Sequence, residues 1–251
     1  MYDKIAVINQ NADHKKAAED MAKELSLPIA VNINDFDAIL YLGDNGLFLQ
    51  ENKNPGQGPL YIDFVEGPIA HRLKYGGGKG QMIAKAAGIK GSYRPSVLDA
   101  TAGMGRHGLI LASLGCKVDM IERMPIIAAL LEDALKRAAK HEPLQEILVK
   151  IELHKCDSLA FIENITVKPD VIYLDPMFPE RQKSALVKKE MRIFKNLAGT
   201  DDDSDNLLQS ALTKAAKRVV VKRSRKAPFL NGMKPSYILE GKSNRFDIYL
   251  T

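Results

Sequence analysis

A short stretch after a predicted buried strand carries the residues with the most evident chemistry. VIYLDPMFPE, residues 171–180, runs from four apolar or aromatic residues into an acid, two prolines, a methionine and a phenylalanine. A carboxylate such as Asp175 accepts hydrogen bonds, and the ring of Phe178 offers a face for a planar group. Pro176 fixes its own φ and cannot continue the strand. The pattern favours a ligand held between Asp175 and Phe178; the alternative is a tight turn with a buried Phe178.

A glycine-rich loop, DATAGMGRHG at residues 99–108, lies between a predicted strand and a predicted helix. Gly103, Gly105 and Gly108 have the spacing of the G-x-G-x-x-G dinucleotide pattern. Glu122 follows roughly 20 residues after the first glycine, at the end of the next strand, where an acid can bind ribose hydroxyls. Both NAD and S-adenosylmethionine carry an adenosine, so the loop alone fits either cofactor.

Acids at two other strand ends favour S-adenosylmethionine over NAD. Asp99 precedes the glycine loop, where a carboxylate would repel a pyrophosphate but attract the cationic amino-acid end of S-adenosylmethionine. After the third strand, Asp157 can accept a hydrogen bond from the adenine amino group, and Ser158 can cap the next helix. The alternative for Asp157 is an ordinary N-cap or turn residue. We therefore expect S-adenosylmethionine as the cofactor.

The elements that must position these residues alternate between strand and helix from Ser96 onward. Such alternation implies a mainly parallel sheet covered by helices on both faces. The predicted fold class is α/β, with a Rossmann-like, doubly wound seven-stranded sheet that ends in a C-terminal antiparallel hairpin. The predicted strands are 96–100, 117–122, 150–157, 170–175, 218–222, 236–241 and 245–250, and the predicted helices are 106–115, 125–140 and 207–216.

The first 75 residues have a different pattern. Short strands are predicted at 5–9, 38–42, 47–50 and 61–65, with one helix at 14–25. This pattern predicts a small N-terminal α+β subdomain at 1–75, followed by the cofactor-binding domain at 76–251.

Composition bounds the remaining possibilities. The chain has 251 residues, 45% of them hydrophobic, which is enough for one large domain with an appendage. No run approaches the ~20 apolar residues that span a bilayer, and no signal peptide is evident, so we expect a cytoplasmic protein without membrane contact. Cys116 and Cys156 have no CxxC spacing, and we expect no metal.

The basic residues gather in two runs. The net charge of +5 is weak evidence for a polyanionic partner, but residues 181–195 and 217–226 each carry six Lys or Arg. Because both runs follow strands at the same predicted end of the sheet, they favour a phosphate-binding rim over two solvated faces.

Four segments carry a resemblance to a known family. The Asp175–Phe178 tetrapeptide resembles the [D/N]-P-P-[Y/F] loop of methyltransferases that act on exocyclic amino groups. DFVEGPIAHRLKYGGGKG, VLDATAGMGRHG, VIYLDPMFPERQKSALVKKEMRIF and RVVVKR, in this order, closely resemble the ribosomal small-subunit methyltransferase J family. The resemblance covers essentially the whole chain. It implies a class I methyltransferase that moves a methyl group from S-adenosylmethionine to the exocyclic amino group of one guanosine in 16S ribosomal RNA, either free or in the 30S subunit.

The resemblance also implies roles for individual residues. In such a loop, acceptors orient the poorly nucleophilic amino nitrogen, and the aromatic ring stacks on a flipped-out base. The family usually has Arg-Asp after the glycine loop, so His107 departs from its pattern, and contact through side chain or backbone stays open. Arg106 and His107 would border the cofactor, and Glu122 and Arg123 would hold its ribose and flank its adenine. The expected cofactor-binding residues are Asp99, Gly103, Arg106, His107, Glu122, Arg123, Asp157, Ser158 and Asp175, and the expected catalytic residues are Asp175 and Phe178.

Other functions remain open at this point. A DNA adenine or protein glutamine methyltransferase would also use a proline-bound loop after the fourth strand. An NAD-dependent oxidoreductase is supported by the glycine pattern and Glu122 only. A non-catalytic RNA-binding protein could retain the same fold. The oligomeric state is undetermined.

Overall fold

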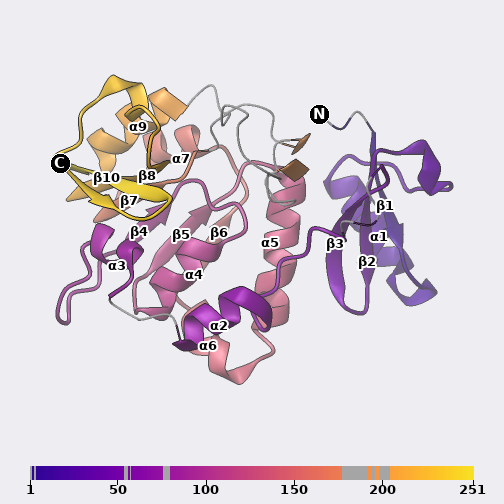
Figure 1. The fold of residues 1–251 in the computed structure, drawn as a ribbon. Helices are drawn as coiled ribbons and strands as arrows, with labels where there is room; N and C mark the ends of the chain where they lie inside the picture. The colour runs from indigo at the N-terminus through magenta and orange to yellow at the C-terminus, as the bar shows by residue number, and fades with distance from the viewer. Residues whose placement is uncertain are drawn as a thin grey trace. The chain divides into compact units, whose positions relative to one another are not determined.

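The computed structural model describes residues 2, 4–53, 56, 58–75, 80–176, 192–193, 196–197 and 204–251. The chain forms two compact units (Figure 1). The first comprises Met1–Asp63, Met124–Arg137 and Met177–Thr200, and the second comprises Phe64–Arg123, Ala138–Pro176 and Asp201–Thr251. Phe178 and most of the basic run at 181–195 lie outside the described residues.

The first unit contains a three-stranded sheet in the order β1-β2-β3. β1 pairs in parallel with β2, and β2 pairs antiparallel with β3 through a turn in which Gly46 has a φ of +94°. Glycine adopts this conformation without the steric cost that other residues incur. The bounds are β1 (Ile5–Asn9), η1 (Ala12–His14), α1 (Lys15–Glu24), η2 (Ile33–Asp35), β2 (Ala38–Gly43) and β3 (Gly46–Glu51).

The strand predicted at 61–65 is wrong. Leu60 forms an isolated bridge with Leu49, and the ladder does not continue beyond it. Two residues further along, the carbonyl of Ile62 accepts a hydrogen bond from the Arg137 guanidinium and not from a neighbouring strand. A side chain therefore takes the place of the strand partner that the apolar pattern suggested.

Helix α5 (Pro125–Ala138) contributes to the first unit, although it is distant in sequence. The Asp133 carboxylate accepts from the backbone N–H of Leu47 at 3.0 Å and from Arg137 Nε at 2.7 Å. The first of these bonds ties the helix to β3, and the second holds the carboxylate in place within the helix. The domain boundary at residue 75 stays a prediction, because the compact first unit contains this helix as well as the N-terminal sheet.

The second unit contains the predicted seven-stranded sheet, in the order β6-β5-β4-β7-β8-β10-β9. Its first five strands in that order run parallel, and β10 is antiparallel to both β8 and β9. The fold class predicted from the sequence is thereby confirmed, including the C-terminal hairpin. The bounds are β4 (Val97–Asp99), β5 (Val118–Ile121), β6 (Ile151–His154), β7 (Val171–Leu174), β8 (Arg218–Ser224), β9 (Tyr237–Glu240) and β10 (Asn244–Leu250).

Helices of the second unit cover both faces of this sheet (Figure 1). Successive residues of a strand point to opposite faces. On one face, α7 and α9 bury Ile162 and Leu208 against a cluster that includes Ile121. On the other face, α4 crosses β5 so closely that a Cβ at Gly108 would lie 2.4 Å from Met120. The bounds are α2 (Gly67–Tyr75), α3 (Met82–Ala86), α4 (Arg106–Ser113), α6 (Glu142–Leu148), α7 (Ser158–Asn164), α9 (Ser204–Lys214) and η5 (Leu230–Gly232).

Helices α2, α3 and α6 had not been predicted. Each is short, and α2 and α3 lie on either side of a glycine-rich stretch of the sequence, residues 76–80, where glycine lowers the helix propensity. No helix among the described residues is long and apolar enough to cross a membrane.

Candidate functional site

The predicted site residues lie at the carboxyl ends of the parallel strands. The chain order of the sheet reverses beside β4, because β5 lies on one side of it and β7 on the other. Ligands of open α/β sheets bind at such a switch point. Asp99 ends β4, and Asp175 follows β7. The Thr101 hydroxyl accepts from the backbone N–H of Asp175 at 2.6 Å, which joins the turns after these two strands.

The glycine loop contacts the acid at the end of β5. Gly103 and Gly105 have φ values of +53° and +69°, and Gly105 is the N-cap of α4. Two left-handed residues fold the loop tightly, a conformation that glycine allows. The N–H of Gly103 donates to Glu122 Oε2 at 2.8 Å, and Glu122 is only 8% exposed. The structure thus brings together the loop and the acid that the sequence assigned to the adenosine.

The turn after β6 differs from the prediction in the residue that caps the next helix. Asp157, and not Ser158, is the N-cap of α7, and its carboxylate accepts from the N–H of Ala160 at 2.9 Å. Ser158 is buried and donates to the carbonyl of Ala100 at 2.6 Å. The prediction that Ser158 caps the helix is wrong because Asp157 has the extended backbone of an N-cap residue. Asp157 is exposed, and its proposed contact with adenine stays a prediction.

Asp99 is the most buried acid of the site. It is 1% exposed, and its carboxylate accepts from the N–H of Thr101 at 3.3 Å. Burial raises the pKa of Asp99 to about 7, and the charges of Asp175 and Glu122 act in the same direction. Carboxyl groups that raise one another's pKa in this way would be relieved by a cationic ligand group, so the turn favours a cation as its ligand.

A second set of contacts surrounds Asp175. Lys222, from β8, forms an ion pair with Asp175 Oδ2 at 2.7 Å. The His107 ring lies 3.7 Å from the same oxygen and 3.0 Å from the Tyr173 hydroxyl, both measured from Nδ1. Burial lowers the pKa of His107 to about 4, so the ring is neutral at pH 7. Burial raises the pKa of Tyr173, so its hydroxyl stays protonated and shares a hydrogen bond with Nδ1.

The two predicted arginines flank this region. Arg106 is the first residue of α4 and is exposed, whereas Arg123 directly follows Glu122 and is half-buried. The structure therefore places both next to the loops that bear the acids, and their contacts with the cofactor stay predictions.

Sequence reasoning missed the roles of Thr101, Tyr173 and Lys222. Lys222 belongs to the basic run that had been interpreted as a phosphate-binding rim. Its ammonium contacts Asp175 instead, and Arg223 is buried, donating to the carbonyl of Pro228. Lys217 precedes the opposite end of the same strand, where it bonds to Tyr93 and Asp170. Lys217 thus lies at the other end of β8 from the exposed Arg225 and Lys226, and the phosphate-binding rim stays a prediction.

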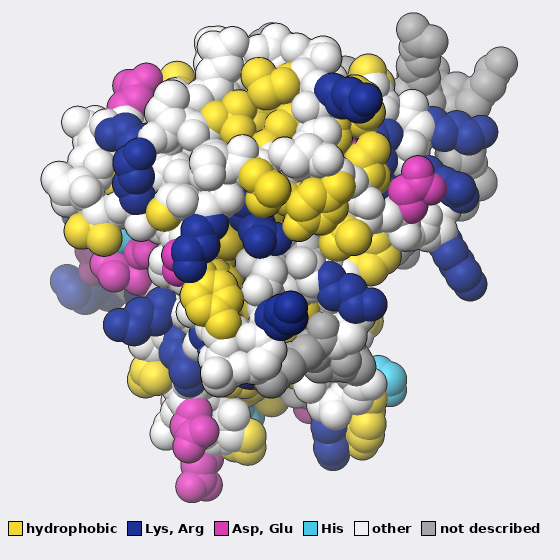
Figure 2. Space-filling view, turned by 90° about the vertical axis from the view of Figure 1, so that its left-hand side faces the viewer, with side chains coloured by type: hydrophobic (Ala, Val, Ile, Leu, Met, Phe, Trp, Pro, Cys, Tyr) yellow, Lys and Arg dark blue, Asp and Glu magenta, His cyan; other side chains and the backbone are white. Residues whose placement is uncertain are grey.

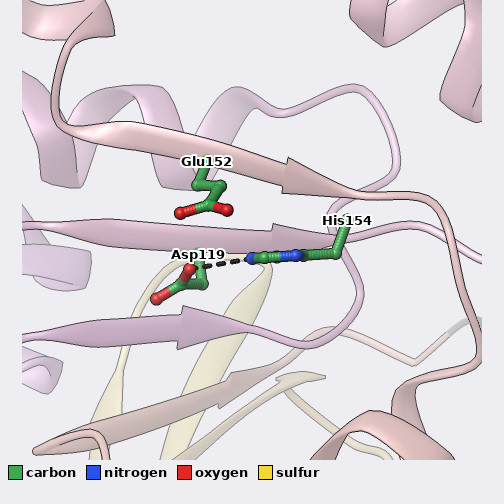
Figure 3. Close-up of side chains that lie close together, drawn as sticks. All are labelled: Asp119, Glu152 and His154. Carbon is green, nitrogen blue, oxygen red and sulfur yellow. Dashed lines mark hydrogen bonds and ion pairs between the residues drawn. The ribbon is translucent and has the colours of Figure 1, made fainter.

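A further group of possible metal ligands lies on β5 and β6 (Figure 3). Asp119 and Glu152 are register partners, and His154 follows two residues later on the same face. His154 Nε2 lies 2.9 Å from Asp119 Oδ1, and one ligand atom from each residue lies within 4.8 Å of the others. A carboxylate pair with an imidazole can hold a divalent cation. The expectation of no metal therefore stays a prediction.

On the surface, basic and apolar side chains are interspersed. Figure 2 shows Lys and Arg among hydrophobic side chains on the face that carries the C-terminal strands. Strand β9, at the edge of the sheet, exposes Tyr237 and Ile238. The hydroxyl of Tyr237 accepts from Arg218 at 3.0 Å.

Comparison with known proteins adds an independent observation. A family model described as "Putative SAM-dependent methyltransferase" matches residues 21–251. The chain is 51% identical to a protein of Cellvibrio japonicus named ribosomal RNA small subunit methyltransferase J, over 95% of this chain and 94% of that protein. A protein of the same name from Pseudomonas aeruginosa is also 51% identical, over 95% and 92% of the two chains. A SAM-dependent methyltransferase from Neisseria gonorrhoeae with a known crystal structure is 32% identical in sequence to this chain. The two structures superpose with a TM-score of 0.77, over 98% of this chain and 96% of that one.

Proposed function

The chain belongs to the ribosomal RNA small subunit methyltransferase J family, and on this premise we propose that it methylates the exocyclic amino group of one guanosine in 16S ribosomal RNA. The observation that carries the proposal is the meeting of Asp99 and Asp175 at the switch point of the sheet, linked through Thr101. Membership of this family supports neither another amino-group substrate nor an NAD-dependent reaction.

The residues of the second unit fit S-adenosylmethionine. Its α-amino group is a cation, and the carboxyl groups of Asp99, Asp175 and Glu122 would attract it. Glu122 would accept from ribose hydroxyls while it holds the N–H of Gly103. Arg106, His107 and Arg123 would border the cofactor, and Asp157 and Ser158 would close the adenine end. When bound, the cofactor supplies an electrophilic methyl group.

Asp175 would act on the nucleophile. Its carboxylate would accept a hydrogen bond from the target amino group and hold the nitrogen in line for attack. A preorganised acceptor also stabilises the positive charge that develops on the nitrogen. The Phe178 ring would stack on the base once it is flipped out of the RNA.

The RNA partner requires a surface as well as a pocket. Basic side chains interspersed with exposed aromatic and aliphatic ones suit a nucleic acid, because phosphates pair with cations and bases stack on rings. We further propose a cytoplasmic location, either free 16S RNA or the 30S subunit as the substrate, and a cofactor-binding domain at 76–251 preceded by a separate subdomain.

The proposal is tested by incubating the protein and labelled S-adenosylmethionine with 16S RNA, or 30S particles, that lack this methyl group. We expect one labelled nucleoside, an N2-methylguanosine, on mapping. Label in adenine of DNA, or in protein glutamine, would contradict the proposed substrate. Stabilisation by S-adenosylhomocysteine and not by NAD is expected in thermal unfolding, since a ligand of the native state raises its stability.

A further inference from the structure

We infer that Lys222 is a positioning residue for methyl transfer, which fixes one carboxylate oxygen of Asp175 and leaves the other to accept from the target amino group. The inference rests on the proposed function. It assigns a role in the active site to a lysine of the neighbouring strand β8.

The sheet places Lys222 beside Asp175. Strands β7 and β8 are parallel neighbours with Leu174 opposite Val221, so the residues that follow each of these stand next to one another. Lys222 Nζ lies 2.7 Å from Asp175 Oδ2, and the two side chains are 23% and 31% exposed. An ammonium at this distance makes a charge-assisted hydrogen bond to one defined oxygen.

Asp175 is held at a second point through its backbone. Its N–H donates to the Thr101 hydroxyl at 2.6 Å. With the main chain fixed on one side and Oδ2 on the other, the carboxylate plane has little freedom to rotate. Among the described residues, no donor contacts Oδ1. That oxygen is therefore the one that can accept a substrate N–H.

The remaining neighbours do not replace the lysine. His107 Nδ1 is 3.7 Å from Oδ2, beyond a hydrogen bond, and is hydrogen-bonded to the Tyr173 hydroxyl instead. Since burial keeps this imidazole neutral at pH 7, it brings no charge to Asp175. Within the described part of the chain, Lys222 is the one charged partner of this carboxylate at neutral pH.

Lys222→Met, Lys222→Arg and the control Lys217→Met test this inference. Lys217 precedes the same strand but contacts Tyr93 and Asp170 at its other end. In single-turnover methyl transfer at saturating cofactor and RNA, Lys222→Met should lower the rate by about 10²-fold, because slight misplacement of a reacting group has an effect of this size. Lys222→Arg should recover part of the rate, and Lys217→Met should be normal. Affinities for S-adenosylhomocysteine and RNA should change little in all three.

A second measurement does not depend on activity. NMR titration of the His107 ring reports the charges near Asp175. Burial lowers the pKa of His107 most, Asp175 raises it, and Lys222, Arg72 and Arg106 lower it. Lys222→Met should therefore raise the pKa of His107, whereas Lys217→Met should leave it unchanged. Near-normal transfer by folded Lys222→Met, or an equal loss in Lys217→Met, would overturn the inference.

Failure of the inference differs from failure of the proposed function. Wild-type protein that methylates no 16S RNA or 30S particle would overturn the function and the role of Lys222 with it. Wild-type activity together with an active Lys222→Met variant would overturn the role of Lys222 alone. If Lys222→Met does not fold, Lys222→Gln, which keeps much of the length but loses the charge, replaces it, and its rate should fall below that of Lys222→Arg.

Discussion

The sheet of the second unit carries two clusters that each combine a histidine with a carboxylate, and they differ in what the histidine contacts. At the switch point, Asp175 pairs with Lys222, while His107 is hydrogen-bonded to the Tyr173 hydroxyl. On β5 and β6, His154 itself lies 2.9 Å from Asp119, which is 46% exposed. The first arrangement has a fixed carboxylate, one oxygen of which contacts no donor in the described part of the chain, and a neutral ring. The second is a solvent-accessible pair. Similar residue types therefore have different chemistry because their neighbours differ.

The largest expected effect follows from removing the acid of the first cluster. Asp175→Ala should lower the single-turnover rate by roughly 10²–10³-fold, by analogy with the loss of one preorganised group in an oxyanion hole. Cofactor affinity can fall as well, so the assay needs saturating S-adenosylmethionine. Asp119→Ala, the same change in the second cluster, is the control and should keep its rate. Equal rates for the two variants would remove the distinction between the clusters.

The burial of His107 predicts a dependence of stability on pH. Its pKa is lowered to about 4 in the native state, and an unfolded histidine has a pKa of about 6.5. As the pH falls, the unfolded chain therefore binds this proton before the native protein does. The contribution of neutral His107 to the free energy of unfolding is complete above about pH 6.5 and is lost as the pH falls toward 4. Relative to His107→Asn, the free energy of unfolding of the wild type should fall by about 3 kcal/mol between pH 7 and pH 4.

Denaturant unfolding of both proteins across this pH range measures the difference. Asn keeps an acceptor near the position of Nδ1, so the comparison at pH 7 reports packing and the change toward pH 4 reports titration. A constant difference across the range would show that His107 is not held neutral.

Glu122 lies between the two clusters and tests whether they act separately. Its N–H donates to the carbonyl of His154, and its carboxylate accepts from Gly103. Glu122→Ala should weaken binding of S-adenosylhomocysteine by roughly 1.5–3 kcal/mol, through the loss of a charged hydrogen bond. Glu152→Ala, on the neighbouring strand, is the matched control. Unchanged affinity in calorimetry would exclude Glu122 from the cofactor site.

The smallest effect is expected at the second cluster. His154→Ala should cost about 0.2–1 kcal/mol of unfolding free energy, because a partly exposed polar contact between two side chains contributes little. Thermal unfolding with and without Zn²⁺ extends this test. A rise in the melting temperature with Zn²⁺ that His154→Ala abolishes would identify Asp119, Glu152 and His154 as a metal site. It would also contradict the expectation of no metal.

The sequence by itself determined the class of fold and the edge of the sheet at which the site lies. Alternating apolar runs and helical periodicity predicted all seven strands of the larger sheet. The acidic residues at the ends of these strands were the predicted site residues Asp99, Glu122, Asp157 and Asp175. These signals are local, since each depends on residues within a few positions of one another. The strand predicted at 61–65 failed because its partner is a distant side chain, Arg137, which no local pattern specifies.

Only the tertiary structure decided which side chains meet. Lys222 is 47 residues from Asp175, and Tyr173 is 66 from His107. The pairing of Lys222 follows from the order and register of β7 and β8, which the basic run in the sequence did not indicate. Burial then set the charge of His107, because desolvation depends on everything packed around the ring. Strand order and desolvation are properties of the assembled sheet, and so the partners of the site residues emerged only with the fold.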